Sequence, residues 1–179
     1  MAVDLRADNL LPDSPAMLSK RRWLYRIATL VLTVILGLGV VDVLGWWHAY
    51  GVASASVSAS GGGYDLTVRY GAVSRPALAT PFEIVVTRAD GFDGPLTIAV
   101  DHRYLAMWDL NGMVPAPSGE RVNGDWVEWE FDPPDGTTFT FVYDGRVEPA
   151  QQTSRDGAVA VVDDGQVAVE VEFTTQVRP

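Results

Sequence analysis

Few side chains in this sequence have the types and spacing that chemistry requires, and the most suggestive ones surround a single histidine. Asp101 and His102 are adjacent, and Met107 and Met113 follow them. Imidazole and thioether ligands suit Cu(I). One histidine with scattered methionines makes a poor site, however. We therefore predict no metal and no cofactor, and keep Asp101, His102 and Met107 only as weak candidate ligands.

The sequence lacks the motifs of other kinds of catalytic chemistry. The chain has no cysteine, which excludes disulfides, thiolate nucleophiles and cysteine-ligated zinc or copper. It also has no G-x-S-x-G sequence and no phosphate-binding G-x-x-x-x-G-K-[ST] loop. Paired aspartates such as Asp132 and Asp135 could bind Ca²⁺, but aspartate is also an ordinary turn residue. The sequence therefore predicts a protein that is not an enzyme.

The charge is divided unevenly along the chain. Residues 1–26 carry five basic and three acidic side chains, whereas from Tyr50 onward there are eight Arg and nineteen Asp or Glu, a balance of −11. Binding to phosphate backbones needs clustered Lys and Arg. Nucleic acid is therefore excluded as a partner.

One segment is long and apolar enough to cross a bilayer. Ile27–Val41 carries no charge, Asp42 interrupts the run, and apolar residues continue to Trp47. At 1.5 Å per residue this stretch spans about 30 Å, the thickness of the hydrocarbon core. We predict a transmembrane helix over 23–49. The alternative is a cleaved signal peptide, because Ala53-Ser54-Ala55 has the form of a cleavage site.

The flanking charges orient this helix. Basic side chains adjoin only its N-terminal end, namely Lys20, Arg21, Arg22 and Arg26. A flanking segment with such an excess of basic residues stays on the cytoplasmic side of the membrane. We therefore expect residues 1–22 to form a cytoplasmic tail in the cell membrane, with the rest of the chain outside the cytoplasm.

The same helix has features that could serve a partner. Mostly small residues recur every four positions and share one stripe: Thr29, Thr33, Gly37, Val41 and Gly45. Small residues let helices approach closely in lipid, although they are also common in membrane helices generally. Asp42 is either a passive group near the interface or the partner of a polar group on another helix. The stripe and Asp42 are our candidate interface with an integral membrane protein.

The rest of the chain has the two-residue period of β-strands. Residues 50–63 are small and of low complexity, and form either a stalk or a first edge strand. Residues 64–179 show strict alternation, for example in Asp125–Asp132 and Gln166–Thr175, where Val167, Val169, Val171 and Phe173 would point inward. Asp164-Gly165 between two apolar runs is the clearest hairpin turn.

These strands define a fold class. Seven or eight are expected, and seven of them lie at Tyr64–Tyr70, Phe82–Arg88, Pro95–Asp101, Asp125–Asp132, Thr137–Tyr143, Ala158–Asp163 and Gln166–Thr175. Short strands with frequent turns predict an all-β, two-sheet sandwich of the immunoglobulin-like or fibronectin-III-like kind, here preceded by one transmembrane α-helix.

Tyr104–Gly119 departs from the alternation and is predicted to be a long connection. Its large apolar residues include Leu105, Met107, Trp108 and Met113. They either cap the core or form an exposed loop that contacts a partner.

The expected function follows from these parts. It is a non-enzymatic accessory or interaction subunit, anchored in the bilayer beside a larger membrane partner. The alternative is an anchored ligand-binding or metal-delivery domain.

Overall fold

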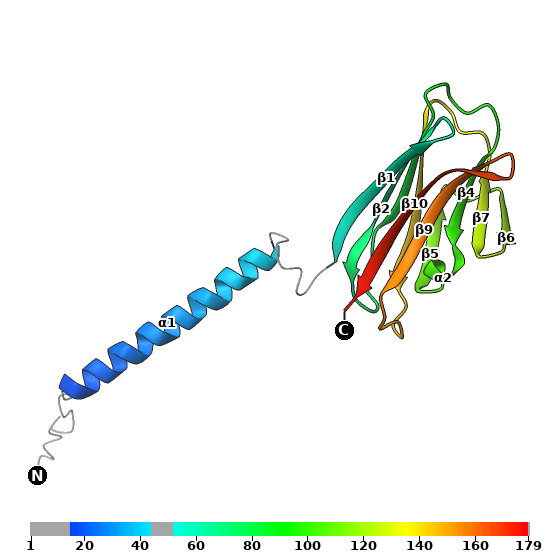
Figure 1. The fold of residues 1–179 in the computed structure, drawn as a ribbon. Coiled ribbons are helices and arrows are strands. Elements are labelled where there is room, and N and C mark those ends of the chain that lie inside the picture. The colour runs from blue at the N-terminus through cyan, green and yellow to red at the C-terminus, as the bar shows by residue number, and fades with distance from the viewer. Residues whose placement is uncertain (1–14, 44–51, 179) are drawn as a thin grey trace, which may run out of the picture. The chain divides into compact units, whose positions relative to one another are not determined.

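The computed structural model describes residues 15–43 and 52–178 of the chain. They belong to two compact units, Met1–Trp47 and His48–Pro179. The first unit contains one helix and the second a β-domain, as the ribbon in Figure 1 shows.

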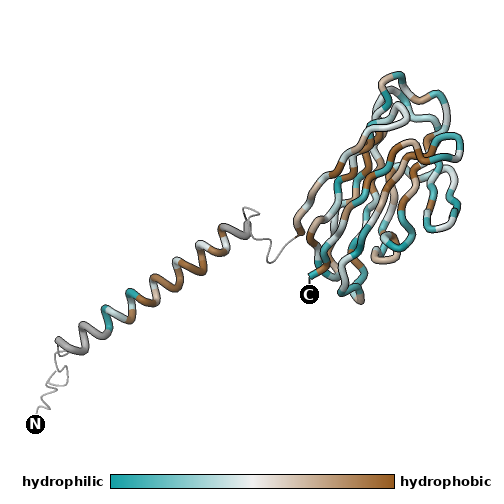
Figure 2. Tube along the Cα trace, viewed as in Figure 1, coloured by the Kyte–Doolittle hydropathy of each residue, from teal (hydrophilic) through white to brown (hydrophobic). Residues whose placement is uncertain are grey.

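Helix α1 runs from Pro15 to Val43. Proline suits the first turn of a helix, where its missing N–H would have no intrahelical partner. Every side chain described in this helix, from 21 to 40, is exposed, and apolar residues line most of that length (Figure 2). The 20 residues of Arg21–Val40 are long and apolar enough to cross a membrane. Of the predicted span 23–49, residues 44–49 lie outside the described part of the chain.

The β-domain is built from two sheets. Sheet A has the strand order β1 (Ala53–Gly61), β2 (Tyr64–Ser74), β3 (Phe82–Thr87), β8 (Thr138–Val147), β5 (Trp108–Val114). Sheet B has the order β10 (Gln166–Val177), β9 (Arg155–Asp163), β4 (Leu96–Asp101), β7 (Trp126–Phe131), β6 (Gly119–Asn123). All these neighbours are antiparallel, so the predicted all-β sandwich is confirmed.

Strand β10 connects the two sheets. Most of its length pairs with β9 in sheet B, but its last residues, Gln176 and Val177, pair in parallel with Val73 and Ser74 of β2. Nine of the ten strands described therefore form one continuous hydrogen-bonded path, from β5 to β6, that curls into two facing halves, and β1 pairs with β2 beside that path.

The core lies between the sheets and is rich in aromatic rings. Tyr104, Phe82 and Phe141 are among its largest fully buried side chains. The ring of Tyr104 packs edge-on against Phe82, with centroids 5.3 Å apart, and its hydroxyl lies 3.1 Å from that of Thr175. Pairs of this geometry stabilise a core beyond the area that they bury.

The backbone conformation and pairing settle two points of local structure, the state of residues 53–61 and the turn at Asp164-Gly165. Ala53–Gly61, which the sequence left open as stalk or strand, is strand β1 and pairs with β2 along its whole length. The Asp164-Gly165 turn joins β9 to β10 with both residues at positive φ, 49° and 75°, as a two-residue hairpin turn requires.

Two other expectations were wrong. The predicted long connection Tyr104–Gly119 contains the end of the short helix α2 (His102–Leu105) and all of strand β5. Val167 does not point inward with Val169, because a register shift between them turns it outward and leaves it 51% exposed.

Candidate interaction surfaces

The predicted stripe on helix α1 is only partly described. Thr29, Thr33 and Gly37 lie on the helix with exposed side-chain positions, whereas nothing is described of the side chains of Val41 and Asp42, and Gly45 lies outside the described residues. The hydroxyl of Thr33 donates to the carbonyl oxygen of Thr29 at 2.9 Å. Because the helix itself satisfies this polar group, Thr33 can face lipid without a partner.

The apolar residues of the predicted partner loop belong to the core instead. Met107 is fully buried and Trp108 is 7% exposed, and both belong to the hydrophobic cluster between the sheets. Leu105 and Met113 are partly buried against that cluster. The exposed-loop interpretation is therefore wrong for these four residues, because helix α2, strand β5 and the turn between them place their side chains over the sandwich interior, although Leu110 and Val114 of the same segment are exposed.

The weak metal candidates do not share one surface. The carboxylate of Asp101 caps helix α2 by accepting hydrogen bonds from the backbone N–H groups of Arg103 and Tyr104, at 2.6 and 3.0 Å. His102 is exposed, while Met107 is buried in the core. Within residues 15–43 and 52–178, no three His, Cys, Asp or Glu side chains gather closely enough to hold a metal ion.

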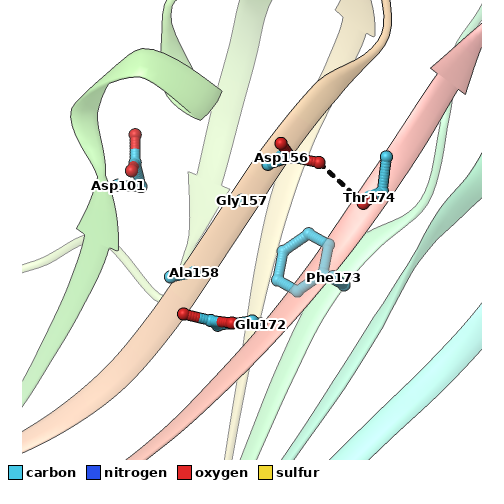
Figure 3. Close-up of a pocket in the computed structure, with 7 residues that line it drawn as sticks. All are labelled: Asp101, Asp156, Gly157, Ala158, Glu172, Phe173 and Thr174. Atoms are coloured by element: carbon cyan, nitrogen blue, oxygen red, sulfur yellow. Dashed lines mark hydrogen bonds between the residues drawn. The ribbon is translucent and has the colours of Figure 1, made fainter.

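Sequence reasoning did not find the hollow on the outer surface of β9 and β10. It has a volume of about 420 Å³, and its acidic lining residues are Asp101, Asp156 and Glu172 (Figure 3). Asp156 accepts a hydrogen bond from the hydroxyl of Thr174 at 2.7 Å. Two of its three carboxylates are thus already engaged, Asp101 by helix α2 and Asp156 by Thr174.

The outer face of sheet B is acidic and has a floor of small residues. One row across the five strands reads Glu170, Ala160, Ala99, Glu128 and Arg121. Further carboxylates on this face come from Asp156, Glu172 and Glu130, and Arg121 is the basic residue of the row. This face therefore favours positively charged groups and repels a second copy of itself.

Glu128 is the buried member of this face, with 4% of its side chain exposed. It accepts hydrogen bonds from Arg121 at 2.5 Å and from Asn123 at 2.8 Å. Burial alone would raise the pKa of Glu128, but the Asn123 and Arg121 hydrogen bonds and the Arg121 charge outweigh it and lower the pKa. Glu128 is therefore a structural carboxylate that stays ionised.

The outer face of sheet A has a different chemistry. Hydroxyl and valine side chains cover most of it: Ser54, Ser56, Ser58, Ser60, Thr67, Val85, Thr87, Thr138, Thr140 and Val142. Near its centre Arg69 forms an ion pair with Glu83 at 3.7 Å. Asp65, Asp144 and the ion pair between Arg146 and Asp109 add further charges to this face. Because most of its other side chains are uncharged, this is the face of the acidic domain on which an uncharged protein surface can be placed at the least electrostatic cost.

Comparisons with known proteins find similarity in structure only. No protein-family model and no curated protein sequence matches the chain. Among solved structures, a non-cellulosomal cohesin from the hyperthermophilic archaeon Archaeoglobus fulgidus matches with 14% identity and a TM-score of 0.36, over 64% of this chain and 91% of the cohesin. The collagen-binding subdomain of Enterococcus faecalis surface protein ACE matches with 12% identity and a TM-score of 0.34, over 62% of this chain and 96% of that one. With scores this low, we base the function on the surfaces of this chain.

Proposed function

We propose that this chain is a single-pass membrane protein whose β-sandwich lies outside the cytoplasm and serves as a non-enzymatic interaction subunit of an integral membrane partner. The observation that carries the proposal is helix α1. Its apolar side chains are exposed throughout residues 21–40, with Leu36 at 63%, whereas Leu66 and Leu96 of the sandwich are buried. A bilayer provides the apolar surroundings that such a helix needs.

The surfaces of the sandwich support a binding role over a catalytic one. The outer face of sheet A is broad and regular and carries mostly hydroxyl and valine side chains. In the acidic hollow on sheet B, the hydroxyl of Thr174 is engaged by Asp156. The predicted stripe of Thr29, Thr33 and Gly37 would add a contact with a partner helix inside the membrane.

The absence of cysteine from the sequence makes the topology directly testable. Single cysteines would be introduced as Ser14→Cys before the helix and Ser58→Cys on exposed strand β1. In intact cells, a membrane-impermeant maleimide should label only the Ser58→Cys chain, and after lysis it should label both. Labelling of the Ser14→Cys chain in intact cells would mean that the N-terminus lies outside, opposite to the proposed orientation. Release of the chain by alkaline extraction would refute the anchor.

The partner is tested by crosslinking in native membranes followed by affinity purification. The expected result is one integral membrane protein recovered in a fixed ratio, and a Gly37→Leu variant should reduce that recovery. Leu36→Val changes the neighbouring position without widening the stripe, so it serves as the matched control. Recovery of the chain alone, in its wild-type form, would contradict the accessory role.

The alternative, an anchored ligand-binding or metal-delivery domain, has one observation in its favour, the hollow lined by Asp101, Asp156 and Glu172. Metal analysis of the purified full chain and calorimetric titration with CaCl₂ and CuCl separate the two functions. Stoichiometric metal that is lost in Glu172→Gln would favour the alternative.

A further inference from the structure

The strands at the sheet edges of this domain differ in how they are protected from pairing with another chain. Exposed edges usually carry charges, bulges or proline, or are very short. Strand β5 has Asp109 and a register shift, and is followed by Pro115, while β6 is only five residues long and carries charged side chains. Strand β10 carries Glu170 and Glu172 and its own register shift.

Strand β1 has almost none of these protections. Its nine residues, ASASVSASG, contain no charge and no proline, and its one register shift lies at the very start, between Ala53 and Ser54. Among the described strands it pairs with β2 alone, so its other side presents unpaired backbone N–H and C=O groups. Figure 1 shows it at the outer border of its sheet. Of the edges described, β1 is the one best suited to accept another strand.

The sequence of β1 also reads the same in both directions about Val57. Ser56 and Ser58 flank it, then Ala55 and Ala59, then Ser54 and Ser60. In an antiparallel pair related by a two-fold axis, residue i of one strand faces residue j of the other and j faces i. A palindromic strand therefore places like side chains opposite each other in every one of these pairs.

From the open edge and the palindrome together, we infer that β1 is a homodimerisation strand, which pairs antiparallel with β1 of a second copy so that Val57 faces Val57. This extends sheet A without interruption from one copy into the next. It goes beyond the proposed interaction with a membrane partner and does not depend on it.

The side chains of β1 fit this arrangement on both faces. Serine faces serine on the outer side, where cross-strand hydroxyl pairs are favourable. Ser58 already lies 2.9 Å from the hydroxyl of Thr67, but a hydroxyl has one donor and two acceptor positions, so it can accept a further bond. On the inner side, Val57 and Ala59 are partly buried, and their remaining apolar surface would be covered by Val57 and Ala55 of the second copy.

The distribution of charge also favours a dimer contact at strand β1. With a balance of −11 from Tyr50 onward, two copies repel each other through most of their surface. β1 contributes no charge to the contact, and anchoring in one membrane raises the effective concentration of the copies.

Register-specific disulfide crosslinking tests the inference. Full-length Ser56→Cys and Ser58→Cys chains with different tags would be co-expressed, and their membranes oxidised with copper phenanthroline. Facing Cβ atoms in such a pair lie about 4.5–5.5 Å apart and diagonal ones about 7–8 Å, so the mixed pair should crosslink at least about tenfold more than either variant with itself. Ser54→Cys with Ser60→Cys should behave in the same way. Equal yields in all combinations, or no mixed product, would overturn the inference.

A second variant tests the edge itself. Ser56→Glu places a carboxylate beside the two-fold axis and should lower the Ser54→Cys/Ser60→Cys crosslink at least about fivefold, whereas Thr140→Glu, on the same face but in the interior strand β8, should leave it unchanged. An unchanged crosslink in Ser56→Glu would also overturn the inference. Alkaline extraction of the same membranes reports on the anchor separately.

Discussion

Helix α1 exposes apolar side chains of the kind that the β-sandwich buries. Leu36 on the helix is 63% exposed, whereas Leu66 in strand β2 is fully buried. In the sandwich, facing sheets surround the apolar side chains, whereas those of residues 21–40 of the helix are exposed. The proposed bilayer would supply apolar surroundings to the helix, as the second sheet does to the first.

The largest expected effect comes from charging the helix. Leu32→Arg combined with Leu36→Arg should abolish membrane insertion, because each arginine at the centre of a span costs about 3 kcal/mol on insertion scales. Fractionation followed by alkaline extraction measures the result. Thr140→Arg, on the outer face of the sandwich, is the control and should leave the membrane fraction unchanged. If the doubly charged helix still resists extraction, an apolar phase around α1 is ruled out.

A smaller effect is expected when a leucine is replaced by alanine in each of the two regions. Leu66→Ala should reduce the free energy of unfolding of the sandwich by about 3 kcal/mol, because it leaves a cavity in a closely packed core. Leu36→Ala should leave that free energy unchanged. Denaturant unfolding of the full chain in detergent, followed by fluorescence of the buried Trp108 and Trp129, checks both variants. Equal losses would mean that the helix packs on the sandwich.

Within the sandwich, Gly157 provides a sharper test of packing. A Cβ atom at Gly157 would lie 2.6 Å from Cδ2 of Tyr104 and 3.0 Å from Cε2 of Phe173. Gly157→Ala should therefore destabilise the domain by about 2 kcal/mol through overpacking. At Gly119 the nearest atom would be Cβ of Glu130 at 3.7 Å, an ordinary contact, so Gly119→Ala should change stability by less than about 0.5 kcal/mol.

The smallest effect concerns the pH dependence of the sandwich. The pKa of Glu128 is lower in the folded state than its ordinary value of 4.5. Its contribution is therefore fully present above about pH 4.5 and is lost as the pH falls through the folded pKa. Wild-type Tm should fall more steeply than that of Glu128→Gln below this pH, while at pH 7 the variant should lose about 1 kcal/mol. Parallel Tm curves would mean that the Arg121 and Asn123 contacts stabilise nothing.

Regular, half-buried strands could be predicted from the sequence alone. In β7, Val127, Trp129 and Phe131 are buried on the inner face, as strict alternation predicted. The alternation identifies such strands because one face meets the core and the other meets water. The helix could also be predicted from the sequence, because its uninterrupted run of apolar residues is typical of a helix in apolar surroundings.

Strands at the edges could not be predicted in this way. β6 has Val122 as its one large apolar residue, and that side chain is 67% exposed, so no alternation exists to detect. In β5 the register shift between Leu110 and Gly112 breaks the period. β1 alternates, but between alanine and serine, which differ too little in size to distinguish a strand from a stalk.

The surfaces were harder to predict than the fold. Met107 and Trp108 looked like partner residues because the strand that buries them was not recognised. The alternation of β7 assigns Glu128 to the outer face but does not reveal its burial, which depends on Arg121 and Asn123 of the neighbouring strand. Such facts depend on cross-strand register, which a single sequence does not specify.

The position of β10 has a consequence for biosynthesis. This strand is the tenth and last in chain order, yet it alone hydrogen-bonds to both sheets, to β9 and to β2. Roughly 100 residues separate β2 from the end of β10, which takes roughly 5–20 s to synthesise at about 5–20 residues per second. Throughout that interval β2 lacks this partner strand. The hydrogen-bonded connection between the two sheets is therefore completed only when the last of the ten strands described has been synthesised.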